Sequence, residues 1–437
     1  MSNTLTLKRL LLVLGDIILL YFSLIITVFF GFFKEFNTEI LLLHLLPFSI
    51  VYFFWLIIFY IAGLYDLHLI KTKTSFYTRA LGAISFGLIL GMLFFYTIPF
   101  FGITPKTNLI LNGLIFGLLF LGWRNLSHSL FSLHFLTKVT IVGEGLQVKN
   151  LKKEIQKRPY LGYKLINVDF KKELFPQIKR KNIDTVIFPE ELESDPKVLK
   201  ALYFCLPARV NFLELARAYE LVTEKIPVST ISQAWFLENL REGEKGLYDK
   251  IKRIFDIIMS CFLLILTFPL WLLIALAIKA EDGGPVFYSQ ERVGKDRETF
   301  ILYKFRSMKV GAETKEAIWA KKEDKRITRV GRFLRRIHFD EIPQIVNIIK
   351  GDISLIGPRP ERPEFVEKLE KEIPHYHLRY LIKPGFTGWA QIKFRYGRSV
   401  MDSHEKFQYD LYYLKNRAPL LDIGIFLKTL QLFFRHE

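Results

Sequence analysis

Residues 252–279 read KRIFDIIMSCFLLILTFPLWLLIALAIK, and the fold of the C-terminal third depends on how this apolar segment lies in a membrane. Its apolar part, Ile257–Ile278, is long enough to cross a bilayer, which takes about 20 helical residues. However, basic residues flank both ends and favour the cytoplasmic side for both. Pro269 also favours a kink, with Ser260 and Thr267 as candidate partners for the freed main-chain groups. We therefore expect a re-entrant helix that returns to its original side, rather than a crossing.

Several apolar segments in the N-terminal part of the chain are expected to span the membrane. They cover Leu10–Phe33, Ile40–Tyr65, Ala80–Phe101 and Asn108–Trp123. Basic residues precede the first segment and also lie in the loop between the second and third, at Lys71, Lys73 and Arg79. The other two loops carry little positive charge. By the positive-inside rule, the N-terminus, the 71–79 loop and everything after Arg124 face the cytoplasm.

Asp16 lies inside the first of these segments, where a charge is costly. Either it contacts another helix or a lipid headgroup, or it lies shallow enough to reach the membrane interface. Because Asp16 follows Arg9 by only about 10 Å of helix, we expect the shallow position.

The composition also favours a membrane protein over a nucleic-acid-binding protein. Hydrophobic residues make up 51% of the chain and charged residues 24%, with a formal net charge of +18. Such a charge suits a nucleic acid or an anionic membrane surface, and the apolar segments favour the membrane. Neither a recognition helix nor a single-strand-binding motif is evident, so no nucleic acid partner is expected. Cys205 and Cys261 offer neither a disulfide framework nor metal-ligand spacing.

The middle of the chain alternates between strand-like and helical patterns, which predicts a parallel, doubly wound sheet. Strands are expected at Val139–Val142, Tyr163–Phe170, Thr185–Phe188 and Ala208–Leu213, and a helix at Gln147–Lys157. Gly143-Glu144-Gly145 follows the first strand, where such folds bind phosphate. The third glycine of that motif is missing, and Glu144 places an anion there. Nucleotide sensing and a structural or regulatory role both stay open, and the second is favoured.

In the C-terminal part, Tyr303–Met308 alternates like a strand with Lys304 and Arg306 on one face. Two cations on one face suit a polyphosphate or a lipid phosphate. The alternative is a basic surface strand near anionic headgroups.

Asp340 and Glu341 precede apolar residues at helical spacing, so Asp340 is expected to cap a helix with Pro343 in its first turn. The helix N-terminus favours an anion, which would keep Asp340 ionised and nucleophilic. Glu341 can ligate a divalent cation, and Arg335 and Arg336 just upstream can hold phosphate oxygens. The alternative is that the two acids are only a helix cap.

Two proline- and glycine-rich stretches follow. Prolines on both sides of Arg359 fix the backbone, and a rigid arginine suits bidentate phosphate recognition. The alternative is a turn with an exposed arginine. In Lys383–Gln391, Phe386 and Trp389 are candidates for the membrane interface, or the stretch is a structural turn.

Taken together and in this order, the motifs resemble the bacterial sugar transferase family, the monotopic phosphoglycosyl transferases. The large multi-domain branch, similar to undecaprenyl-phosphate hexose-1-phosphate transferases, matches best. The matching stretches are Lys252–Asp256, Tyr303–Met308, Asp340–Gln344, Gly351–Pro360, Pro384–Gln391 and Tyr409–Lys415. The resemblance implies three domains. They are a four-helix transmembrane bundle at 1–136, a Rossmann-like α/β domain at 137–245, and a mixed α/β monotopic catalytic domain at 250–437 with a re-entrant helix at 252–279.

The resemblance also implies residue roles. Asp340 matches the catalytic nucleophile and Glu341 its partner, which is associated with Mg²⁺. The expected phosphate- and substrate-binding residues are Lys304, Arg306, Arg335 and Arg359. Pro269 matches the proline that breaks the re-entrant helix, although a Ser-Pro pair is common in relatives where this chain has Thr267 and Phe268.

The implied reaction transfers a hexose 1-phosphate from a UDP-sugar to polyprenyl phosphate and releases UMP, through a covalent phosphosugar-aspartate intermediate. It is the first membrane step of surface glycan synthesis, whether O-antigen, capsule or exopolysaccharide. The expected partners are the UDP-sugar, polyprenyl phosphate and membrane lipids; self-association and the identity of the sugar are open. The expected location is the bacterial inner membrane, with the catalytic domain on the cytoplasmic face. The alternative function is a non-catalytic membrane nucleotide sensor or assembly scaffold.

Overall fold

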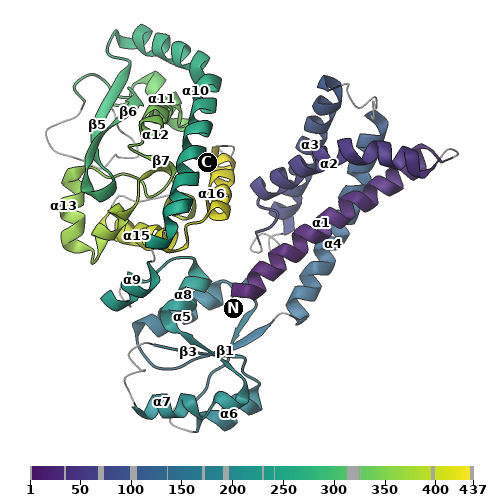
Figure 1. The fold of residues 1–437 in the computed structure, drawn as a ribbon, viewed down its shortest axis with the longest axis vertical. Helices are drawn as coiled ribbons and strands as arrows, with labels where there is room; N and C mark the ends of the chain where they lie inside the picture. The colour runs from purple at the N-terminus through teal and green to yellow at the C-terminus, as the bar shows by residue number, and fades with distance from the viewer. Residues whose placement is uncertain are drawn as a thin grey trace. The chain divides into compact units, whose positions relative to one another are not determined.

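The computed structural model describes residues 2–33, 36–66, 73–98, 106–134, 136–169, 173–189, 196–228, 231–240, 242–312, 324, 326–394 and 399–433. They form two compact units, Met1–Thr223 and Glu224–Glu437. Each unit is described by itself below (Figure 1).

The first unit begins with four long apolar helices. They are α1 (Ser2–Gly31), α2 (Thr38–Ile61), α3 (Lys73–Thr97) and α4 (Lys106–His134). Together with the later helix α10 (Gly246–Asp282), the described residues contain five helices long and apolar enough to cross a membrane. Aromatic side chains such as Trp55, Phe59 and Phe116 are fully buried between α2 and α4. The expected N-terminal spans thus coincide with helices of the required length and apolar character, which indicates a membrane protein. Residues 99–101 of the third expected span lie outside the described residues.

Asp16 makes the contact to another helix that was the alternative to the expected shallow position, and its depth in the membrane stays a prediction. Its carboxylate is fully buried and accepts a hydrogen bond at 2.6 Å from Arg124 on α4, which is also buried. The guanidinium of Arg124 also lies over the Phe120 ring, 4.6 Å from its centroid. Because α1 packs along α4, Asp16 meets a cation 108 positions away in the sequence instead of water.

A parallel sheet of four strands follows in the first unit, in the order β2-β1-β3-β4. The strands are β1 (Thr137–Ile141), β2 (Tyr163–Leu165), β3 (Thr185–Phe188) and β4 (Asn211–Glu214). The second strand is shorter than expected. The fourth begins later because Leu206–Ala208, which contains Pro207, forms a 3₁₀ turn.

Helices cover both faces of this sheet (Figure 1). They are α5 (Leu146–Lys157), α6 (Leu174–Lys181), α7 (Pro196–Tyr203) and α8 (Leu215–Thr223). Leu151 of α5 and Ala218 of α8 share one apolar core, whereas Ile178 of α6 and Leu202 of α7 share the other. The sequence therefore correctly predicted the parallel α/β arrangement.

The second unit combines helices with two small sheets. Its helices are α9 (Gln233–Asn239), α10, α11 (Arg329–Arg336), α12 (Gln344–Lys350), α13 (Pro363–Glu372), α14 (Trp389–Lys393), α15 (Val400–Asn416) and α16 (Pro419–Phe433). An antiparallel hairpin pairs β5 (Phe287–Val293) with β6 (Thr299–Phe305), and β7 (Ser354–Ile356) pairs in parallel with β8 (Gly385–Thr387). The segment before α10 also packs in this unit, since Ile226 N donates to Gln408 O at 3.0 Å.

Pro269 lies inside α10, which is one α-helix of 37 residues rather than two helices separated by a break. Figure 1 shows that α10 turns at its far end, after which β5 runs back. Near the proline, Thr267 Oγ1 donates to the carbonyl of Leu263 at 2.7 Å and accepts from the Trp271 indole at 3.3 Å. Ser260 Oγ has no hydrogen-bond partner in the described part of the chain. Of the two hydroxyls expected to help, only Thr267 bonds the main chain.

Candidate functional site

Asp340 and Glu341 lie in the 3₁₀ turn η9 (Phe339–Glu341), immediately before α12. Asp340 is not the helix cap that the sequence suggested, because Pro343 occupies the N-cap position of α12. His338 precedes the turn with a φ of 57°, in the left-handed region, so the chain reverses sharply there. The two acids therefore stand on a tight turn between α11 and α12.

Glu341 is held by two cations from distant parts of the chain. Lys304 on β6 donates to Glu341 Oε1 at 2.8 Å. Arg359 forms an ion pair with the same oxygen, and its Nη1 lies 3.4 Å from Oε2. Three of the residues expected at the site thus meet in one cluster. A cation pair around one carboxylate, next to a second carboxylate, is an arrangement suited to holding a diphosphate.

Asp340 is in a different electrostatic state from its neighbour. Its side chain is only 7% exposed, and no hydrogen bond or ion pair engages its carboxylate within the described ranges. Burial, followed by the charge of Glu341, raises the pKa of Asp340, against the opposing effects of Lys304 and Arg335. Asp340 is thus a poorly solvated carboxylate whose oxygens are not committed to a partner.

Burial alone would also raise the pKa of Glu341. Arg359 and Lys304 more than offset that effect and hold the pKa of Glu341 well below its usual range. Glu341 is consequently ionised whenever its partners are in place. The sequence could not separate the two acids in this way, because the cations come from β6 and from the loop after β7.

Arg335 and Arg306 do not join this ion-pair cluster. Arg335, in the last turn of α11, donates from Nε to Ser307 Oγ at 2.8 Å, close enough for its charge to act on Asp340. Arg306 is buried, and its guanidinium forms an ion pair with Asp282 at the end of α10 and donates to Pro285 O. Only Lys304 of the expected strand pair therefore reaches Glu341.

Two glycines fix the loop that carries Arg359. Gly385 lies on β8, and Gly388 follows that strand. Gly357 N donates to Thr387 O at 2.8 Å, and Gly385 N donates to Pro358 O at 2.8 Å. A Cβ at Gly385 or at Gly388 would overlap main-chain atoms of Gly357. Only glycine permits this close approach of the two segments, which explains the glycine-rich stretch after Pro384.

A buried pair that the sequence did not reveal supports the same loop. Arg379 donates to the carbonyl of Arg359 at 2.8 Å and pairs with Asp410 on α15 at 3.1 Å. Burial raises the pKa of Asp410 to about 6, although Arg379 and Lys406 act to lower it. The one local signal was an arginine within the aromatic stretch Tyr376–Leu381, which does not indicate a partner.

Trp389 is not at a membrane interface, which corrects one of the two alternatives for this stretch. Its side chain is buried, its indole donates to Glu224 O at 2.9 Å, and its ring stacks on Tyr412 with centroids 5.5 Å apart. The structural role is therefore the correct one for Trp389. Phe386, the other candidate, is half-buried.

The membrane helix α10 is attached to the helix that follows Asp340. Arg253 donates to the carbonyls of Ile348 and Ile349 at 2.6 and 2.7 Å. These carbonyls belong to the last turn of α12, where unsatisfied acceptors favour a cation. The N-terminal part of α10 is therefore joined to α12.

The C-terminal end of α10 is attached to α11, the helix that precedes Asp340. Glu281 accepts from the main-chain N–H groups of Arg329 and Val330, at 2.6 and 3.1 Å, and so caps the start of α11. Apolar packing of Ile278 near Leu334 reinforces this contact. The turn that bears Asp340 is consequently held on both sides by one membrane helix.

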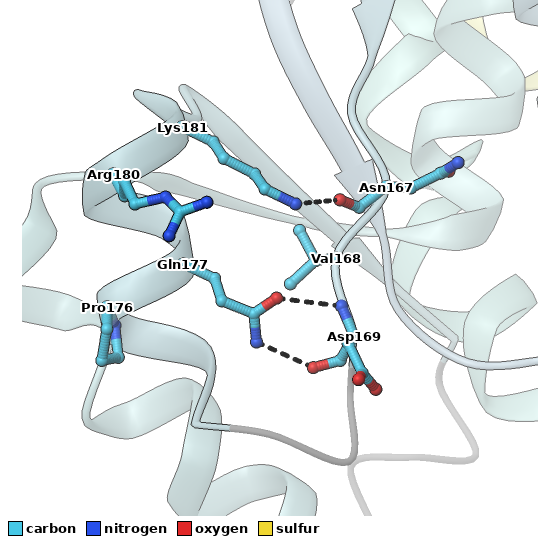
Figure 2. A pocket seen from close by; sticks show the side chains of 7 residues that line it. All are labelled: Asn167, Val168, Asp169, Pro176, Gln177, Arg180 and Lys181. Atoms are coloured by element: carbon cyan, nitrogen blue, oxygen red, sulfur yellow. Dashed lines mark hydrogen bonds between the residues drawn. The ribbon is translucent and has the colours of Figure 1, made fainter.

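A pocket of about 540 Å³ lies in the first unit, between α6 and the chain after β2 (Figure 2). The amide of Gln177 accepts from Asp169 N at 3.0 Å and donates to Asp169 O at 2.9 Å. Lys181 donates to the carbonyl of Asn167 at 2.7 Å. These contacts, drawn in Figure 2, hold the chain that leaves β2 against α6.

Comparison with known proteins shows what the sequence of this chain is similar to. The model of the family described as bacterial sugar transferase matches residues 247–436. A UDP-N-acetylgalactosamine-undecaprenyl-phosphate N-acetylgalactosaminephosphotransferase of Aeromonas hydrophila is 38% identical over 233 residues, which cover 52% of this chain and 53% of that protein. The chain thus matches about half the length of that relative.

Two further relatives extend the comparison. A UDP-glucose:undecaprenyl-phosphate glucose-1-phosphate transferase of Escherichia coli is 32% identical over 311 residues, 67% of this chain and 66% of that protein. An uncharacterised sugar transferase of Bacillus subtilis is 36% identical over 185 residues, 41% of this chain and 86% of that protein.

Proposed function

This chain belongs to the bacterial sugar transferase family, and we propose that it transfers a hexose 1-phosphate from a UDP-sugar to polyprenyl phosphate, releasing UMP. The observation that supports this most is the site itself. A buried, uncommitted Asp340 stands beside Glu341, and the cations Lys304 and Arg359 surround the second acid. The printed names of the relatives describe sugar-phosphate transfer to undecaprenyl phosphate.

In the proposed reaction, a carboxylate oxygen of Asp340 attacks the phosphorus that bears the sugar. The bond between this phosphorus and the bridging oxygen breaks, and UMP leaves with that oxygen. The sugar phosphate is then held on Asp340 as an acyl phosphate. An oxygen of polyprenyl phosphate attacks the same phosphorus, which frees Asp340 and yields the polyprenyl diphosphosugar. Covalent catalysis of this kind divides one difficult displacement into two easier ones.

The residues of the chain assist mainly through charge and position. Lys304 and Arg359 neutralise the diphosphate, and Arg335 adds positive charge on the Asp340 side. In phosphoryl transfer, such positioning and electrostatic stabilisation provide most of the acceleration. A poorly solvated Asp340 is also a better nucleophile than one surrounded by water.

The donor set fits Mg²⁺. This ion is often held by one or two carboxylates, with substrate phosphates and water completing its shell. Asp340 is uncommitted, and Glu341 Oε2 makes only a 3.4 Å contact with Arg359 Nη1. Glu341 would hold the ion, which would supply further positive charge to the diphosphate when bound.

The contacts of α10 support a re-entrant membrane helix. Arg253 before Pro269, and Glu281 after it, both bond to the same compact unit. Between them, side chains such as Phe262 and Ile265 are exposed and apolar. A helix whose two ends return to one domain enters the bilayer and comes back on the same side. The basic residues on both flanks also support a catalytic unit at the cytoplasmic face of the inner membrane.

The α/β domain of the first unit has helices on both faces of its parallel sheet, and its strand order β2-β1-β3-β4 is that of flavodoxin-like doubly wound sheets rather than the classic Rossmann order. Its glycine loop after β1 lacks the full phosphate-binding motif. We propose a structural or regulatory role for it.

The test is a UMP-release assay with purified full-length protein, polyprenyl phosphate and Mg²⁺. UDP-N-acetylgalactosamine, UDP-glucose and UDP-galactose are compared as donors, and Asp340→Ala is the control. The proposal expects UMP with at least one donor and none with the variant. Release of UDP would contradict it, because that product belongs to ordinary glycosyl transfer. An Asp340→Ala protein that sustains full glycan synthesis in cells would instead support a scaffold.

A further inference from the structure

One face of α11 carries an unusual combination of side chains. Arg329, Arg332, Phe333 and Arg336 are all exposed, and Phe333 is 61% exposed. Their spacing of three, four and seven positions places them along one side of the helix. In the described part of the chain, none of the three guanidinium groups forms a hydrogen bond or an ion pair. The face is therefore both strongly basic and partly aromatic, and its guanidinium groups have no partner among the described residues.

The opposite face of α11 fixes this orientation. Gly331 is pressed against the main chain of Ser307, where a Cβ would overlap the carbonyl. Leu334 is 2% exposed and shares a core with Ile274 and Ile278 of α10. Since α11 cannot rotate without losing these contacts, the arginine face points outward.

The position of α11 indicates what this face meets. Its core partners belong to the part of α10 after Pro269, and Glu281 of α10 caps its start. Neighbouring α10 side chains such as Leu273 and Leu276 are more than 60% exposed and apolar, at 63% and 68%. The helix with the basic face is thus attached to the end of α10 at which, in the re-entrant arrangement proposed above, α10 would leave the bilayer.

We propose that this face of α11 docks on anionic phospholipid headgroups. Arginines extend to lipid phosphates while their stems stay on apolar surface, and an aromatic ring between them suits the interfacial layer. Each basic residue near an anionic surface strengthens membrane attraction several-fold. The docking sets the depth of α11 in the membrane. It also makes the position of the catalytic unit depend on anionic lipid.

The test measures depth in the full-length protein. A nitroxide label is placed at position 333 (Phe333→Cys, with Cys205→Ser and Cys261→Ser) in nanodiscs of phosphatidylcholine with or without phosphatidylglycerol. With phosphatidylglycerol, we expect the label to be accessible to oxygen and protected from an aqueous nickel chelate. Without it, or with Arg329→Glu and Arg332→Glu together, the protection from nickel should fall by about fivefold or more.

The matched control is Lys368→Glu with Lys371→Glu on α13, which changes the net charge equally and lies away from the turn of α10 (Figure 1). It should leave the protection unchanged. The glutamates in α11 suit a helix N-terminus, so folding should be retained. UMP release in detergent, measured in parallel, reports on catalysis separately. Equal nickel access in both lipid mixtures, or equal effects of both double variants, would overturn the proposal.

Discussion

The ammonium group of Lys304 donates a hydrogen bond to the carboxylate of Glu341 at 2.8 Å. Together with the ion pair from Arg359, this contact gives the two neighbouring acids different charge states and different partners. Glu341 is ionised and paired with cations, whereas Asp340 is buried and has no hydrogen-bond or ion-pair partner among the described residues. The difference leads to opposite expectations for the two acids.

Glu341→Gln should lower both stability and activity. The change leaves Lys304 and Arg359 without their charged partner, at a cost of about 1–3 kcal/mol of unfolding free energy. UMP release should fall by about 100-fold or more, because an electrostatic contact at the site is lost. The folded pKa of Glu341 is below its ordinary 4.5, so its contribution to stability is present above that pH and lost as pH falls through the folded pKa. Thermal unfolding in detergent, followed against pH, checks this.

Asp340→Asn should abolish UMP release and yet raise the melting temperature at neutral pH. Folding raises the pKa of Asp340 above its ordinary 3.8, so the ionised side chain costs stability. The gain from the amide should be fully present above the folded pKa and should vanish below the ordinary value. If Asp340→Asn and Glu341→Gln lowered the melting temperature alike, both acids would be acting as structural caps.

Gly388→Ala should damage the site from a distance. The added Cβ would overlap the carbonyl of Gly357 and displace the loop that presents Arg359. We expect a raised KM for the UDP-sugar and at least about a tenfold loss of kcat/KM, because the arginine no longer meets Glu341. Gly246→Ala is the matched control in the same unit, since nothing lies within 4 Å of a Cβ there. Steady-state kinetics of the two variants decide the matter, and equal kinetics would contradict the proposed role of the loop.

Asp16→Ala should destabilise the transmembrane bundle. It leaves Arg124 buried without its counter-ion, and breaking one partner of a buried pair costs about 3–5 kcal/mol. The double change Asp16→Ala with Arg124→Leu should recover part of this loss, because no charge is then left unpaired. Heat-induced unfolding of the purified proteins in detergent tests both. A double variant less stable than the single one would show that the pair itself is strongly stabilising.

The sequence was most informative where local chemistry and short-range spacing suffice. Asp340, Glu341 and Arg359 each stand in a motif of turn-forming or charged residues, and the structure brings the last two together. The apolar lengths of the membrane helices likewise need no distant partner to be recognised.

Other features depend on contacts that no local pattern reveals. Lys304 and Arg306 are two positions apart, but β6 ends at Phe305, so the alternation of faces does not extend to Arg306. Its charge is therefore taken by Asp282. Asp16 finds Arg124 only because α1 and α4 pack together. The pairing of Arg379 with Asp410 similarly depends on how α15 folds back.

The most direct test of the account is to trap the sugar phosphate on Asp340. Full-length protein is incubated with its UDP-sugar and Mg²⁺ in the absence of polyprenyl phosphate, and peptides are then analysed by mass spectrometry. The account predicts a burst of UMP of about one equivalent per enzyme, and a hexose-phosphate mass on the peptide that contains Asp340. Adding polyprenyl phosphate should remove that mass. UMP release that requires both substrates together, with Asp340 never modified, would contradict the covalent mechanism.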